Sequence, residues 1–180
     1  PFFFTLPDIS KLHQFDRKTS IQIVSEDGEP IGSFGDVVGE YVEYKDLPKA
    51  MVNAAMATED RRFFEHFGID VLGILRAMVV NLRAGHVKQG GSTITQQVAK
   101  NVFLTSDRTM MRKIQEALLA LQLEMRYSKE EIMSIYLNRV YLGSGTFGVS
   151  AAAQRYFGKD ADELNIAESA LLAGIIQAPS

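Results

Sequence analysis

The chain has 180 residues, of which 46% are hydrophobic and 23% charged, a composition typical of a globular protein and not of a disordered or fibrous one. Its formal net charge of −3 excludes a generally basic nucleic-acid binder, and the absence of cysteine excludes disulfides, thiolate metal sites and cysteine nucleophiles. No apolar stretch approaches the roughly 18 residues that a membrane-spanning helix needs. A chain of this length is expected to form one domain, over residues 1–180. Because the sequence begins at Pro1 without a leader, we expect this domain to be excised from a longer protein.

The first part of the chain, about residues 1–45, favours extended structure. Residues 21–24 and 31–34 are rich in apolar and β-branched side chains, and they flank the turn-forming segment 26–30. Asp27-Gly28 supplies the positive φ that a tight hairpin requires. The sequence therefore predicts a small β-hairpin at the N-terminal edge of the domain.

From Pro48 onward the apolar spacing becomes helical. Asp70, Ser128 and Asn165 stand where side chains cap helix starts, the last two with a Glu three residues later, and Gly85 stands where a helix ends. We expect helices at about 48–59, 71–84, 92–103, 109–127, 129–140, 149–156 and 166–176. The fold class is thus mainly α, with a helical core over about residues 46–180.

Three familiar chemistries find little support. The glycine spacing of residues 143–148 matches a dinucleotide fingerprint, but that motif needs a preceding strand, and here a helix precedes it. The three histidines are too scattered for a helical metal pair, and no Gly-x-Ser-x-Gly elbow surrounds Ser92 or Ser144. Nucleotide binding, metal hydrolysis and serine hydrolysis all lose ground, and the glycines are better explained as a turn between helices.

Two glutamates, Glu59 and Glu116, lie close to basic residues in the sequence. Glu59 and Asp60 end a helix just before Phe63 and Phe64, where partial burial would suit one of them to act as a general base. The alternative is a solvated, salt-bridged helix end with a packed Phe. Glu116 follows Arg112 and Lys113 by four and three residues, which on its own also describes a surface ion-pair ladder.

The mild net charge conceals a basic stretch. Residues 81–113 carry a net charge of +5, which leaves −8 on the remainder. Helix starts near Ser92 and Thr109 would add exposed N–H groups, so this stretch is a candidate site for phosphate or diphosphate. A solvated basic face is the alternative; the interleaved Phe103, Leu104, Met110 and Met111 also suit the surface of an anionic membrane.

Five motifs in this order carry a resemblance to a known family, at residues 57–68, 90–101, 112–117, 129–143 and 168–180. The sequence resembles the peptidoglycan glycosyltransferases, which are the transglycosylase domains of bifunctional class A penicillin-binding proteins and their monofunctional relatives. The resemblance covers about residues 40–180.

The resemblance implies a mainly α, lysozyme-like, two-lobed helical domain, with a mobile membrane-facing lobe near residues 86–111. It implies polymerisation of lipid II, a disaccharide-pentapeptide on a polyprenyl diphosphate, into β-1,4 glycan chains with inversion. It places the domain on the outer face of the bacterial plasma membrane, with lipid II, the growing glycan strand, the membrane surface and moenomycin-type inhibitors as partners.

The resemblance also assigns roles to residues. Glu59 matches the general base and Glu116 the second essential carboxylate, near the donor. The positions that hold the diphosphate are Lys100, Arg108, Arg112 and Lys113. The positions that support or bind substrate are Asp60, Phe63, His66, Ser92, Thr93, Gln96, Gln97 and Asn101. No cofactor is required, no protein metal site is expected, and Mg²⁺ or Mn²⁺ would act only with the substrate diphosphate.

Two other functions stay open. A lysozyme-like hydrolase or lytic enzyme would use the same fold and paired carboxylates, although a neutral glycan does not require the basic residues around them. A catalytically silent module that binds a membrane or partner through Met110 and Met111 is the third possibility, and the presence of Glu59 and Glu116 argues against it.

Overall fold

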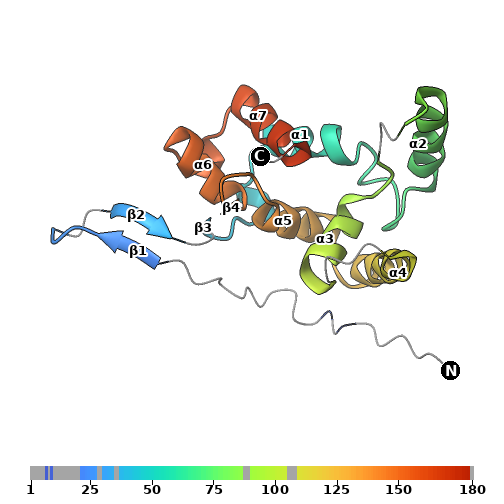
Figure 1. Cartoon of the computed structure of the whole chain (residues 1–180), viewed down its shortest axis with the longest axis horizontal. Helices are drawn as coiled ribbons and strands as arrows, with labels where there is room; N and C mark the ends of the chain where they lie inside the picture. Colours follow the sequence, from blue (N-terminus) through green and yellow to red (C-terminus); the bar gives the residue numbers. More distant parts are fainter. Residues whose placement is uncertain are drawn as a thin grey trace. The chain divides into compact units, whose positions relative to one another are not determined.

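A computed structural model of the chain describes residues 7, 9, 21–27, 30–34, 37–86, 90–104 and 109–178. It divides into two compact units: Pro1–His13 with Glu59–Tyr136, and Gln14–Thr58 with Leu137–Ser180. The described residues form seven α-helices and only short strands, so the prediction of a mainly α chain is confirmed (Figure 1). The prediction of a single domain stays a prediction.

The second unit contains the predicted hairpin. Strands β1 (Ile21–Val24) and β2 (Pro30–Phe34) are antiparallel, with Ile21 opposite Phe34. A further strand pair was not predicted: β3 (Val37–Val38) runs parallel to β4 (Thr146–Phe147). Two-residue strands have no alternation to detect, and their pairing joins segments far apart in the chain. The β structure therefore extends beyond the N-terminal edge.

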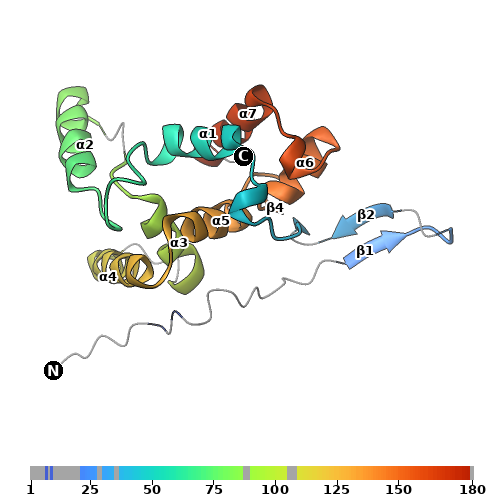
Figure 2. The same ribbon diagram turned by 180° about the vertical axis from the view of Figure 1, so that it is seen from behind.

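Three helices complete this unit: α1 (Lys49–Glu59) up to Thr58, α6 (Val149–Phe157) and α7 (Ile166–Gln177). The unit also contains the end of α5 (Lys129–Arg139) and the 3₁₀ turns η2 (Tyr44–Asp46) and η3 (Ala161–Glu163). The Nε2 of Gln177 donates to the carbonyl of Thr58 at 2.9 Å, so α7 ends against the end of α1 (Figure 2). Gly148 has a φ of +86°, and a Cβ there would lie 2.6 Å from the carbonyl oxygen of Asn138. This position therefore requires glycine. The predicted glycine turn between α5 and α6 is confirmed, because the backbone N–H of Thr146 donates to the carbonyl of Gly143 at 2.9 Å.

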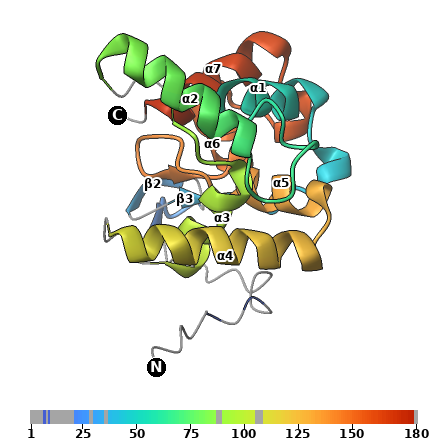
Figure 3. The same ribbon diagram turned by 90° about the vertical axis from the view of Figure 1, so that its right-hand side faces the viewer.

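The first unit contains α2 (Val71–Ala84), α3 (Ile94–Phe103), α4 (Met110–Arg126) and most of α5 (Lys129–Arg139). Helices α3 and α4 lie side by side in every view (Figures 1 and 3). The fully buried side chains of this unit include Ile94, Leu119, Leu123 and Ile132. The predicted helix positions are confirmed to within a few residues, as are the capping boxes at Ser128 and Asn165.

On α4 the apolar residues Ile114, Leu118 and Met125 are exposed, whereas Leu119, Ala120 and Leu123 are buried. One expectation about a helix cap is wrong. Asp70 stands at the N-cap of α2, but its side chain makes no capping hydrogen bond and accepts from Arg62 Nη1 at 3.2 Å. A cation within reach takes the carboxylate that a backbone N–H would otherwise use.

Within the described part of the chain, no helix is both long enough and apolar enough to cross a bilayer.

Candidate active site

Glu59 is the last residue of α1, and α3 holds its side chain in place. The Nε2 of Gln97 donates to Glu59 Oε2 at 2.6 Å. Glu59 is half-buried, so its carboxylate is partly shielded and still reachable. Burial, and to a lesser degree the negative charge of Glu59, raise the pKa of Tyr136 on α5, so this phenol stays protonated. Its hydroxyl is buried and has no hydrogen-bond partner among the described residues.

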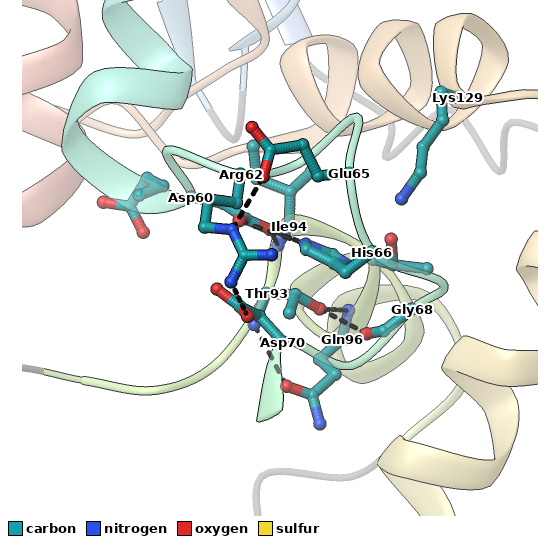
Figure 4. A network of polar contacts seen from close by, with 12 residues as sticks. Asp60, Arg62, Glu65, His66, Gly68, Asp70, Thr93, Ile94, Gln96 and Lys129 are labelled. Atoms are coloured by element: carbon teal, nitrogen blue, oxygen red, sulfur yellow. Dashed lines mark hydrogen bonds and ion pairs between the residues drawn. The ribbon is translucent and has the colours of Figure 1, made fainter. Parts of the chain in front are cut away.

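Asp60 and His66 form a buried pair directly after Glu59 (Figure 4). His66 Nε2 lies 2.9 Å and 3.1 Å from the two carboxylate oxygens of Asp60, and the backbone N–H of Ile94 donates to Oδ2 at 3.1 Å. Phe63 is fully buried and lies edge-on to His66, with ring centroids 6.3 Å apart. These three predicted residues therefore brace the segment that follows Glu59, while Phe64 is exposed.

Thr93 ties the start of α3 to the same segment. Its hydroxyl donates to the carbonyl of Gly68 at 2.6 Å and accepts from the backbone N–H of Gln96 at 3.1 Å. Gln96 Oε1 in turn accepts from the N–H of Thr93 at 3.0 Å, which completes a capping box. Thr93 and Gln96 are both buried, and their side chains form hydrogen bonds within the protein.

This arrangement corrects the expected anion site at the start of α3. The N–H groups of Ile94 and Gln96 are already bonded, the first to the carboxylate of Asp60. A negative side chain from the chain itself occupies the positive end of the helix, which is the most favourable place for it. The start of α4 differs, since Thr109 caps only the N–H of Arg112 there, at 3.1 Å.

Two cations of α4, Arg112 and Lys113, pair with the carboxylate of Glu116. Its carboxylate accepts from Arg112 Nη1 at 3.1 Å and from Lys113 Nζ, and the same Nζ donates to Ser92 Oγ at 2.8 Å. Because the Glu116 side chain is only 2% exposed, this is not the surface ion-pair ladder that spacing alone allows. A buried carboxylate held by two cations fixes their positions far more firmly than an exposed one.

The Nε–H of Arg112 is buried and has no partner among the described residues, so this donor can serve a bound ligand. Lys100 and Asn101 lie exposed near the end of α3. Arg108 and residues 87–89 and 105–107 of the predicted mobile lobe lie outside the described residues. All other predicted site residues lie in the first unit.

Four further residues of this unit were missed. Glu124, Lys129 and Thr95 form a buried polar cluster that contacts Phe63 through Lys129, and Tyr136 lies near Glu59. Thr95 falls within the second sequence motif, and Lys129 and Tyr136 fall within the fourth, but nothing in the sequence shows that Lys129 points inward.

Among the described residues, no group of three or more His, Asp or Glu side chains could hold a metal ion. The carboxylate of Glu116 already forms ion pairs with Arg112 and Lys113. The donor set around Glu116 therefore suits an anionic ligand and does not fit a protein-bound divalent cation.

Comparison with known proteins identifies the family. The sequence profile of the family described as Transglycosylase matches residues 27–180. The chain is 49% identical, over its full length, to penicillin-binding protein 1A of Aquifex aeolicus (strain VF5), of which it covers 25%. Over 97% of its length it is 49% identical to penicillin-binding protein 1A of Escherichia coli (strain K12) and 47% identical to that of Neisseria cinerea, covering 21% and 22% of those proteins.

The chain spans about a quarter or less of the length of these curated relatives. The match covers all five sequence motifs and the whole of the first unit from Glu59 to Tyr136. The chain therefore belongs to the transglycosylase family and is a peptidoglycan glycosyltransferase domain.

Proposed function

We propose that this domain polymerises lipid II into β-1,4-linked glycan chains with inversion at the anomeric carbon. The observation that carries the proposal is one compact unit that contains both a half-buried carboxylate, Glu59, and a cation cluster fixed by Glu116. An acid-base group and a diphosphate-binding group are the two parts that such a transfer needs. The proposed fold is correspondingly the lysozyme-like, two-lobed one.

Glu59 acts as the general base in this mechanism. It removes the proton from the 4-hydroxyl of the acceptor sugar, and that oxygen attacks C1 of the lipid-linked donor from the face opposite the diphosphate. The new C1–O bond forms as the bond from C1 to the phosphate oxygen breaks, so the polyprenyl diphosphate leaves with the electron pair. Gln97 supports this role because its hydrogen bond orients the Glu59 carboxylate.

Arg112 and Lys113 stabilise the negative charge that develops on the leaving diphosphate. Glu116 holds both cations, and the unpartnered Nε–H of Arg112 supplies a further donor. We place Glu116 as the residue that positions these cations near the donor. We also assign Lys100 and Arg108 to diphosphate binding, as the resemblance to the family implies. Any divalent cation that assists would be carried by the phosphates of the substrate.

The cation cluster favours synthesis over the lytic alternative. A hydrolase acting on a neutral glycan has no leaving group that calls for Arg112 and Lys113 beside a buried Glu116. Incubating the purified protein with labelled lipid II, with and without Mg²⁺ or EDTA, tests the choice. We expect glycan polymer and released polyprenyl diphosphate. Cleavage of preformed glycan without polymer formation would instead support the hydrolase.

We further propose that the first unit binds the outer face of the bacterial plasma membrane through α2, where its lipid-linked substrate lies. The side chains that this helix exposes include Val71, Leu72, Leu75, Met78 and Leu82, the last 76% exposed. Met110, at the start of α4, is 81% exposed. Apolar exposure on this scale is unusual in a monomeric protein surrounded by water.

Replacing Leu72, Leu75 and Leu82 with Gln is expected to weaken vesicle binding at least about tenfold, because each buried CH₂ contributes about 0.8 kcal/mol. Sedimentation with vesicles that contain phosphatidylglycerol measures the change. The matched control replaces Ile166 and Leu171 with Gln, since these residues of α7 are also exposed and apolar. Equal loss of binding in both variants would argue against a specific role for α2.

A further inference from the structure

A buried ion pair joins three helices of the first unit. Lys129, the first residue of α5, places its Nζ 2.7 Å from Oε1 of Glu124 on α4, and the side chains are only 17% and 3% exposed. The hydroxyl of Thr95 on α3 donates to the same carboxylate oxygen at 2.6 Å. A buried charge is costly unless it is paired and hydrogen-bonded, so the position of each partner depends closely on the others.

The same ammonium group contacts the segment that follows Glu59. Lys129 Nζ lies 4.4 Å from the centroid of the Phe63 ring, within the range of a cation–π contact. Figure 4 shows Lys129 extending from its helix toward the segment that carries His66. Phe63 in turn lies against His66, which is bonded to Asp60, the residue next to Glu59. A continuous set of contacts therefore leads from Lys129 to the neighbour of the proposed base.

The backbone of this segment also rests on α4 close to the ion pair. Gly68 has a φ of +77°, and a Cβ there would lie 3.0 Å from the carbonyl oxygen of Ala120 and 3.2 Å from Cγ of Glu124. Two contacts therefore fix residues 60–68: Gly68 packs closely against α4, and the ring of Phe63 contacts the Lys129 ammonium group. Neither contact involves Arg112 or Lys113.

We propose that Lys129 and Glu124 are positioning residues for Glu59, because their ion pair fixes Phe63 and through it residues 60–68. The inference rests on the proposed function in one respect, which is that Glu59 acts as the base. Misplacement of a base by a fraction of an ångström slows the chemical step and leaves donor binding intact. Loss of the Lys129 ammonium should therefore lower kcat and leave KM nearly unchanged.

Lys129→Met tests the proposal, since Met keeps the length and removes the charge. We expect kcat for lipid II polymerisation to fall about 10- to 100-fold, with KM changed less than about twofold. Amide hydrogen exchange of residues 60–68 should become faster. Lys129→Arg should recover most of kcat, because it keeps a cation over the Phe63 ring.

Two controls separate positioning from stability. Lys159→Met removes a similar Lys–Glu pair, whose Nζ lies 2.8 Å from Glu168 Oε1 in the second unit, and should change neither kcat nor exchange at residues 60–68. Lys129→Met combined with Glu124→Gln removes the pair without leaving a charge buried. This double variant should fold and should still have a low kcat, and a wild-type kcat in it would overturn the proposal.

The exchange measurement does not depend on the proposed reaction. If the wild-type protein makes no polymer from lipid II, the proposed function fails, and exchange at residues 60–68 still reports on Lys129. Unchanged exchange in folded Lys129→Met would overturn the positioning role by itself.

Discussion

Glu59→Gln is expected to reduce the rate of lipid II polymerisation by about 10²- to 10⁴-fold, the usual contribution of a general base. The amide has nearly the shape of the carboxylate. Its oxygen can still accept the hydrogen bond from Gln97, whose Nε2 lies 2.6 Å from Glu59 Oε2 in the wild-type protein. What the variant loses is the ability to take a proton from the acceptor hydroxyl. The initial rate with labelled lipid II measures the effect.

The fold should survive this substitution, because Glu59 is only half-buried and makes no ion pair among the described residues. Thermal unfolding of the variant should match that of the wild type. Glu130→Gln makes the same chemical change at an exposed position in the first turn of α5 and should leave the rate unchanged. A Glu59→Gln protein that polymerises at the wild-type rate would remove Glu59 from its role as base.

The helices could be predicted because their signals are local. Periodic apolar spacing and the caps at Ser128 and Asn165 lie within a few residues of each helix start. Other features depend on tertiary contacts instead. These are the pairing of β3 with β4 and the hydrogen bond that Asp70 accepts from Arg62 in place of a backbone N–H. No window of sequence contains that information.

The site shows the same division. Spacing along α4 predicts that Arg112 and Lys113 can reach Glu116, but only packing against α3 buries the carboxylate and adds Ser92. Spacing likewise cannot reveal that Asp60 faces the start of α3 and takes the N–H of Ile94. Residue chemistry therefore identified the charged groups, while packing decides which of them serve the protein and which remain for a ligand.

Arg112→Ala is expected to weaken binding of the diphosphate-bearing donor by about 1.5–3 kcal/mol, which is about a 10- to 150-fold rise in Kd. Arg112 offers a charged group whose Nε–H has no partner among the described residues, so a phosphate oxygen can accept from it. Its removal leaves Glu116 paired with Lys113, so the buried carboxylate is not abandoned. Titration with a short-chain polyprenyl diphosphate disaccharide measures the change.

Arg126→Ala is the matched control, since Arg126 is an exposed arginine in the last turn of the same helix. It removes the same charge and should change Kd less than about twofold, because exposed charges at a distance are largely screened. Equal losses in the two variants would mean that net charge, and not a built site at Glu116, binds the donor. Arg112→Lys should give an intermediate Kd, because a lysine keeps the charge and loses the planar set of donors that a diphosphate can engage at two oxygens.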